Sequence, residues 1–225
     1  MNIVWLLLVS VVLSAAGHFY LTWFDQKRLE QNQEKFNLRA LIPSGKRWIF
    51  LLVMLVALAG MSIWITITYK ENSFLHNAEL ICLLSLLFLA ANVDAREEII
   101  PNTLVLAGLL LRVVFWVAEL CTDPQYMWLT FKNEIIACAI LGVFFFLCGL
   151  IVKGGVGMGD IKLILVMCLF QGLYGVISAL FCALFAAFII AVLLLITKKK
   201  TRKDAIPFAP SILLGALASA FLTGM

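Results

Sequence analysis

Two aspartates stand at points where long apolar stretches meet polar turns. Asp160 lies in the glycine-rich run Gly-Gly-Val-Gly-Met-Gly-Asp-Ile-Lys at residues 154–162, just before a long apolar stretch. Asp94 lies at the end of another apolar stretch and shortly before Pro101-Asn102. An ionisable side chain at the edge of a membrane costs free energy unless it is paired, hydrated or used in chemistry, so its first interpretation is functional.

The chemistry that two such aspartates could perform is peptide hydrolysis. Two carboxyl groups held within a few ångströms of each other cannot both ionise easily, so they share a proton and form one acid and one base. The ionised member can take a proton from water as the water attacks a peptide carbonyl, while the protonated member polarises that carbonyl. Asp94 and Asp160 are therefore predicted to be a catalytic pair that needs neither a metal nor a covalent nucleophile.

Other roles for a membrane aspartate have to be weighed against this one. Either residue alone could cap a helix, pair with a nearby Lys or Arg, or lie among lipid headgroups. The glycine-rich run, the similar contexts and the shared position at a span end favour the catalytic interpretation. A phosphate-binding loop is disfavoured, because the run does not match G-x-x-x-x-G-K-[ST] and Asp160 occupies the place of the anion.

The neighbours of the aspartates have types that suit a positioning role. Pro101 fits the first turn of a helix, where its missing N–H costs nothing, and Asn102 can serve the unpaired amides there. Gly157 and Gly159 allow positive φ angles and a close approach of another segment. Lys162 lies two residues beyond Asp160 and is part of the same motif.

The composition determines the kind of elements that carry these residues. Of the 225 residues, 64% are hydrophobic and 13% are charged, whereas about a quarter of the residues of a soluble domain are charged. A helix needs about 20 apolar residues to cross the hydrocarbon core. The sequence predicts an all-α polytopic membrane protein with about eight spans, near residues 3–24, 48–68, 78–93, 101–120, 134–152, 161–177, 179–197 and 207–224. Seven spans remain possible if residues 161–197 divide differently, and the third and sixth spans are predicted to be short or interrupted.

The positive charges predict the orientation, because loops rich in Lys and Arg stay in the cytoplasm. Six such residues lie between the first two spans and five lie between the seventh and eighth: Lys27, Arg28, Lys35, Arg39, Lys46 and Arg47, then Lys198, Lys199, Lys200, Arg202 and Lys203. Both termini then face outward. Asp94 and Asp160 both fall at the cytoplasmic end of their spans.

The rest of the chain offers little competing chemistry. The six cysteines are scattered with no CxxC pair, so no zinc site is predicted. The net charge of +4 lies mainly in the cytoplasmic loops, where it can meet anionic lipids rather than nucleic acid. We expect a single membrane-embedded domain over residues 1–225, an uncleaved first span, and a short cytoplasmic loop at 25–47. Arg112 is expected to form a structural ion pair with Glu79 or Glu134, or to extend its side chain toward the membrane surface, rather than to act in catalysis.

Three motifs together resemble the type IV prepilin peptidases, membrane aspartic proteases of the GxGD class. Asp94 and Pro101-Asn102 fit the D-x6-P-[ND] pattern of the first catalytic aspartate in that family. Residues 157–162, Gly-Met-Gly-Asp-Ile-Lys, fit the GxGDxK pattern of the second. Residues 206–210, Ile-Pro-Phe-Ala-Pro, look like the start of the final span, with Ala209 where Gly is common. The three matches run from about residue 78 to the C-terminus.

The resemblance implies a definite activity. The substrate would be a prepilin or pseudopilin of type IV pili or type II secretion, cut between a short basic leader and an apolar helix. Cleavage would take place at the cytoplasmic face of the bacterial inner membrane. Asp94 and Asp160 would be catalytic, and Gly157, Gly159, Lys162, Pro101 and Asn102 would support them. The peptidase would use no cofactor.

One departure from the family concerns a second activity. Many members carry paired CxxC motifs between the first two spans, associated with N-methylation of the new N-terminus by S-adenosylmethionine. The loop at residues 25–47 contains no cysteine, so this activity is uncertain. Three alternatives stay open, namely another GxGD intramembrane protease, a small transporter, and a non-catalytic assembly partner. The particular pilin and the oligomeric state are not predicted.

Overall fold

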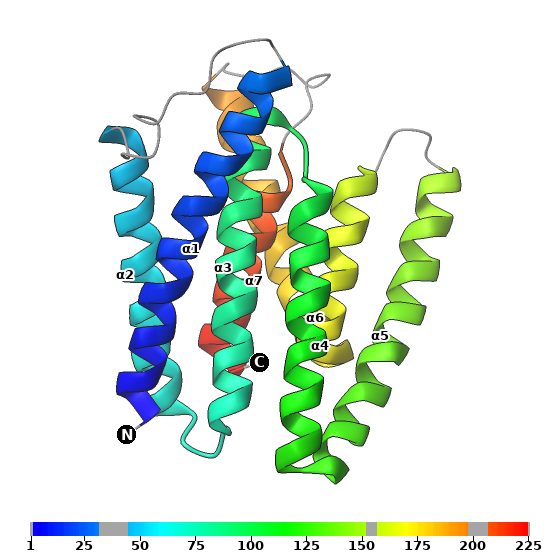
Figure 1. The fold of residues 1–225 in the computed structure, drawn as a ribbon. Coiled ribbons are helices and arrows are strands. Elements are labelled where there is room, and N and C mark those ends of the chain that lie inside the picture. Colours follow the sequence, from blue (N-terminus) through cyan, green and yellow to red (C-terminus); the bar gives the residue numbers. More distant parts are fainter. Residues whose placement is uncertain (1, 32–44, 152–156, 198–206, 225) are drawn as a thin grey trace. The chain divides into compact units, whose positions relative to one another are not determined.

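The computed structural model describes residues 2–31, 45–151, 157–197 and 207–224, and every element in those ranges is a helix (Figure 1). The helices are α1 (Asn2–Gln31), α2 (Gly45–Thr68), α3 (Phe74–Glu97), α4 (Asn102–Thr122), α5 (Pro124–Ile151), α6 (Met158–Ile196) and α7 (Ala209–Thr223). In these ranges, 6 helices are long and apolar enough to cross a membrane, and α7 is a shorter apolar helix. The predicted all-α polytopic membrane class is confirmed.

The chain divides into two compact units, Met1–Ser85 and Leu86–Met225, and the division falls within α3. In the first unit α1 packs against α2. The Ser10 and Ser62 hydroxyls meet at 3.0 Å in the buried contact between these helices. Such serines are well placed in a lipid-embedded pair, because small residues let helices approach and their hydroxyls bond across the contact.

The connection between α1 and α2 is shorter than the predicted loop. The α1 helix continues to Gln31 and α2 begins at Gly45, so both ends of the region expected at 25–47 are helical. Residues 32–44, with Lys35 and Arg39, lie outside the part of the chain that the structure describes.

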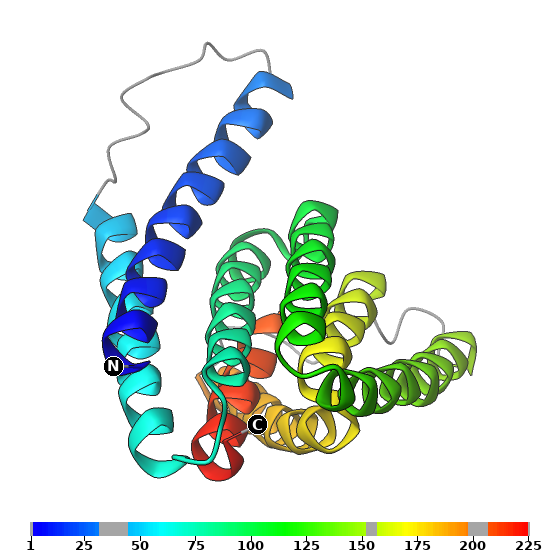
Figure 2. The same cartoon turned by 60° about the horizontal axis from the view of Figure 1, so that its bottom comes forward.

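In the second unit α6 packs against α4, α5 and α7, and α4 also packs against α5. Figure 2 shows α7, in red, lying along the orange part of α6. The two helices approach closely at Gly215, where an added Cβ would lie 2.6 Å from the Ala183 Cβ. The part of α3 that belongs to this unit is lined by buried apolar residues from Leu86 to Val93.

The two predicted spans at 161–177 and 179–197 both lie in α6. This helix is broken at a different position from the one that the sequence predicted. Gly172 has φ 62° and ψ −169°, so it joins two helical segments rather than continuing one. Figure 1 shows the yellow segment running away from the α5 end and the orange segment returning toward the same side. Asn133 of α5 lies against Gly172 and fills the space of a Cβ. The sequence predicted this reversal between residues 177 and 179, at least five residues beyond Gly172.

Two other expectations about the spans need correction. The third predicted span is neither short nor interrupted, because α3 has 24 residues. The last predicted span, 207–224, corresponds to α7, which has only 15 residues. A helix of that length rises about 22 Å, against about 30 Å for the hydrocarbon core. The prediction for the sixth span is confirmed, because Gly172 interrupts α6. The other short helix is α7, whose first residues lie beside Asp94.

Candidate active site

Asp94 lies in the last turn of α3, at the point where the chain leaves the helix. Its side chain is buried, with 5% of its surface exposed. The Asp94 carbonyl accepts the last hydrogen bond of the turn from the Glu98 amide, at 2.8 Å. Glu98 has φ 54°, a left-handed conformation that ends a helix and that costs free energy for a residue with a Cβ. The chain then runs through Ile100, which is buried, to the start of α4.

Pro101 precedes α4 as its N-cap residue, with φ −65° and ψ 132°. The expectation that it lies within the first helical turn was wrong by one position. No side chain caps this helix, so the amide-capping role expected for Asn102 was also wrong. The Asn102 side chain instead accepts a hydrogen bond from the Lys162 ammonium at 2.9 Å. This contact joins the first residue of α4 to the first turn of α6.

Asp160 lies in the first turn of α6, with Gly157 as the N-cap residue. The expectation of a positive φ was wrong at Gly157, where φ is −66°, and Gly159 is not among the positive-φ residues either. The close approach that the glycines were expected to permit is present. A Cβ on Gly159 would lie 3.0 Å from the Ile100 Cβ, and one on Gly157 would lie 2.8 Å from Asp160 Oδ2. Gly154 and Gly155 lie outside the described residues.

The two aspartates come from α3 and α6 and lie at the same end of the second unit. Asp94 is close enough to Asp160 for its charge to act on that carboxyl group. Two contacts hold the supporting segments together, namely Gly159 against Ile100 and Lys162 with Asn102. Asp160 is partly exposed, whereas Asp94 is buried. The structure thus brings together two acidic groups with different access to their surroundings.

A third element reaches this site from the far end of the sequence. The Ala209 amide at the start of α7 donates a hydrogen bond to Asp94 Oδ2 at 3.0 Å, and this contact is buried. The Phe208 amide also bonds to the same carboxylate. Residues 206–210 were predicted to start a span, but no contact between them and Asp94 was predicted. Ile206 lies outside the described residues.

The arrangement fits acid–base chemistry on a carbonyl group. One buried carboxylate with amide donors and one partly exposed carboxyl group can share a proton and act on the same substrate bond. Among the residues that the structure describes, no three His, Cys, Asp or Glu side chains gather to hold a metal ion. The absence of a metal from the chemistry stays a prediction.

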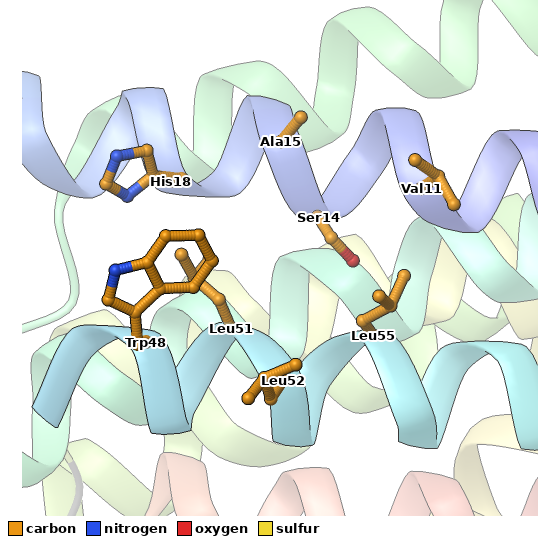
Figure 3. Close-up of a pocket in the computed structure, with 8 residues that line it drawn as sticks. All are labelled: Val11, Ser14, Ala15, His18, Trp48, Leu51, Leu52 and Leu55. Atoms are coloured by element: carbon orange, nitrogen blue, oxygen red, sulfur yellow. The ribbon is translucent and has the colours of Figure 1, made fainter. Parts of the chain in front are cut away.

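A separate groove lies in the first unit, between α1 and α2 (Figure 3). Its volume is about 440 Å³ and its lining is almost wholly apolar, with the His18 and Trp48 rings beside each other at one end. The Ser14 hydroxyl donates to the Ser10 carbonyl at 2.8 Å. No acidic side chain lines this groove, so it cannot supply the carboxyl chemistry of the aspartate pair.

Arg112 forms the buried ion pair that sequence analysis assigned to it. Its guanidinium pairs with Glu134 of α5, and the prediction of that partner is confirmed. A second partner, Glu119, was missed, although it lies two helical turns away on the same face of α4 and contacts Arg112 Nη1 at 3.4 Å. The Trp116 indole donates to Glu134 Oε2 at 2.9 Å. These groups form a structural cluster between α4 and α5.

Comparison with known proteins identifies a family for the chain. The type IV leader peptidase family matches residues 81–196, a range that contains Asp94, Pro101-Asn102 and residues 157–162. The third motif, at residues 206–210, lies beyond the matched range. A comparison of the chain with curated proteins and another with solved structures gave no match. The family match covers more than half of the chain, and the chain belongs to the type IV leader peptidase family.

Proposed function

We propose that this protein is an aspartic endopeptidase that removes the short basic leader from type IV prepilins or pseudopilins. The observation that carries the proposal is that Asp94 and Asp160, each at the end of an apolar helix, lie close enough at one end of the second unit for the charge of Asp94 to act on Asp160. The family match supports a leader peptidase in general. The aspartic mechanism and the prepilin substrate are the parts that we add.

The proposed reaction needs only the two carboxyl groups and water. The ionised aspartate removes a proton from water, the water oxygen attacks the scissile carbonyl carbon, and the protonated aspartate gives its proton to the carbonyl oxygen. Return of these protons then releases the amine and the new carboxyl group. No cofactor takes part in the proposed peptidase reaction.

The location of the aspartate pair explains why a prepilin suits it. Such a substrate has a basic leader followed by an apolar helix, so its scissile bond lies where the membrane meets water. Asp94 and Asp160 lie at helix ends, where the same boundary is expected. Glu97 and Glu98 follow Asp94 and add negative charge that would attract a basic leader.

The proposed orientation places the site at the cytoplasmic face of the bacterial inner membrane. Within the second unit, the end of α3, the start of α4 and both ends of α6 point to one side in Figure 1. The sequence next to these ends includes Arg96, Lys153 and the basic run 198–203, and positive charges of this kind favour the cytoplasm. Lys153 and residues 198–203 lie outside the described residues.

The first experiment compares native protein with Asp94→Asn and Asp160→Asn, each purified in lipid with a model prepilin and followed by mass spectrometry. We expect the native protein to release the leader and each variant to lose at least about 100-fold in rate, the lower range for loss of a general acid or base. Asp123→Asn, at the exposed turn between α4 and α5, serves as a carboxylate control that keeps cleavage. Full activity in both aspartate variants would disprove the mechanism.

The same experiment separates the remaining alternatives. No cleavage by folded native protein would favour a non-catalytic assembly partner or a transporter, and cleavage of unrelated membrane helices would favour another type of GxGD protease. We propose that N-methylation is lost, because the connection between α1 and α2 has no cysteine. A product heavier by one methyl group in the presence of S-adenosylmethionine would disprove that proposal.

A further inference from the structure

The two carboxyl groups of the site differ in the hydrogen bonds they receive. Asp94 accepts the Ala209 amide at 3.0 Å and also bonds to the Phe208 amide. Among the described residues, no hydrogen bond to the Asp160 carboxyl group is present, although Asp160 lies in the first turn of α6. Backbone amides can only donate, and a donated hydrogen bond is stronger when the acceptor is an anion. The two donors therefore favour the charged form of Asp94.

Each aspartate lies close to the N-terminus of a helix, whose positive end stabilises a negative charge. The effect of α6 on Asp160 is therefore compared with the effect of α7 on Asp94. Asp160 lies in the first turn of α6, and Asp94 lies in front of the first residues of α7. A helix N-terminus that makes no hydrogen bond to a carboxylate stabilises its charge less than one whose free amides donate hydrogen bonds to it. Asp94 receives such bonds. Its burial costs free energy for a charge, but it also strengthens these bonds, because water screens them less. The balance of the two helix ends favours charge on Asp94.

The other charged groups near the pair do not reverse this difference. Glu98 acts on Asp94 by like-charge repulsion, but its side chain is exposed and screened by water. Lys162 shares the first turns of α6 with Asp160, and its ammonium is bonded to Asn102. Within the part of the chain that the structure describes, the titratable groups that act on Asp94 are Asp160 from α6 and Glu98 from the end of α3. Asp160 in its protonated form can donate only to an ionised Asp94, which agrees with charge on Asp94.

We infer that the start of α7 holds Asp94 as the ionised member of the pair, so that Asp94 is the base and Asp160 the acid. This inference rests on the proposed peptidase function and deepens it. Ala209 is then a positioning residue that acts through its backbone N–H. The sequence alone does not assign these roles, because both residues are aspartates in similar contexts.

The assigned roles give a complete proton balance. Asp94 takes a proton from water as the oxygen bonds to the scissile carbon, and Asp160 gives its proton to the carbonyl oxygen. Asp94 then gives the proton it took to the leaving nitrogen as the carbon–nitrogen bond breaks. Asp160 recovers a proton from a hydroxyl of the intermediate as the new carbonyl forms. The pair ends in its starting state, and the products are a carboxylic acid and an amine.

The test removes one N–H group and reads the pH dependence of kcat. Ala209→Pro eliminates the donor at the first position of a helix, where proline is tolerated, and Ala209→Gly is the matched control that keeps it. A further variant carries lactic acid in place of Ala209 and is made by cell-free synthesis into liposomes. The amide between residues 208 and 209 then becomes an ester, in which an oxygen replaces the N–H. This ester variant covers the case in which Ala209→Pro does not fold, since proline also restricts Phe208.

The expected result is a shift of the acid limb of the kcat profile to higher pH by about one unit, a tenfold effect at low pH. The alkaline limb and the profile of Ala209→Gly should stay in place. A uniform loss of kcat at every pH, or a movement of the alkaline limb alone, would overturn the inference while leaving the peptidase function intact. A folded native chain that cuts no prepilin would overturn the proposed function, and the role assignment with it.

Discussion

At the scale of single residues, Arg112 illustrates how a full charge is kept inside an apolar helix bundle. It has 1% of its surface exposed and pairs with Glu134 and Glu119, which are also buried. Its guanidinium carbon also lies 5.6 Å from the Trp116 ring centroid. A charge at such depth is tolerated only because these partners replace water. The energy of the cluster therefore depends on all of its members together.

We predict that Arg112→Met lowers the free energy of unfolding by about 3–5 kcal/mol, because it leaves two carboxylates buried without their cation. The measurement is thermal or denaturant unfolding of the protein in nanodiscs. Lys132→Met, at an exposed position of α5, is the matched control and should change stability by less than about 0.5 kcal/mol.

A triple variant tests whether the loss comes from the unpaired acids. Arg112→Met combined with Glu119→Gln and Glu134→Gln should recover much of the stability, because no charge then remains unpaired. A triple variant less stable than Arg112→Met alone would show that the cluster contributes by other contacts.

The sequence predicted single residues where side chains carry the signal. Asp94 and Asp160 stood out because carboxylates are rare at the ends of apolar stretches, and Glu134 stood out as an available partner for Arg112. The Ala209 amide could not be found this way, because every residue except proline has an N–H and no letter marks the one that meets Asp94. The contact of Asn102 with Lys162 was missed for a related reason. The same asparagine side chain suits a helix cap and a hydrogen bond with a lysine, so the residue type does not show which contact it makes.

At the scale of elements, the contact between α6 and α7 depends on a residue without a side chain. A Cβ on Gly215 would collide with backbone atoms as well as with the Ala183 Cβ, which would lie 2.6 Å away. Backbone atoms cannot move aside as the end of a flexible side chain can. Because α7 carries the amides that bond to Asp94, its packing on α6 also affects the site.

We predict that Gly215→Ala destabilises the protein by about 1–3 kcal/mol through overpacking and also lowers kcat, because α7 must shift away from α6. Unfolding in nanodiscs and prepilin cleavage measure the two effects. Gly149→Ala is the control, since no atom lies within 4 Å of its added Cβ, and it should leave both quantities unchanged or slightly improve stability. Equal effects of the two substitutions would contradict the packing argument.

Helix positions were predictable and helix ends were less so. Apolar length located the spans, because a membrane requires a minimum length of apolar helix. It could not locate the break in α6, since residues 161–197 are apolar on both sides of Gly172 and the break depends on contact with Asn133 of α5. The extension of α1 beyond residue 24 was missed because a helix need not stop where it leaves the lipid.

At the scale of the whole molecule, the distribution of positive charge predicts which side of the membrane carries the site. The turn between α4 and α5 lies at the opposite end of the second unit from the aspartate pair (Figure 1). Gln125, in the first turn of α5, and Ile99, near Asp94, are both exposed. A single cysteine at either position therefore reports the orientation.

We predict that a membrane-impermeant maleimide labels Gln125→Cys in intact cells and labels Ile99→Cys only after the inner membrane is opened. Both variants are made in a chain whose six native cysteines are replaced by alanine, and that chain without a new cysteine is the control for background labelling. The reverse pattern would place the aspartate pair on the outer face and exclude cytoplasmic leader removal.

The reversal at Gly172 also bears on how the chain enters the membrane. The segment that begins with Asp160 and ends before Gly172 rises only about 18 Å, less than the roughly 30 Å that an independent span requires. It carries a carboxyl group at one end and cannot stably cross the bilayer by itself. Insertion is thus expected to be coupled, with residues 158–196 leaving the translocon as a paired unit. The aspartate pair would then be completed only after synthesis has passed well beyond Asp160.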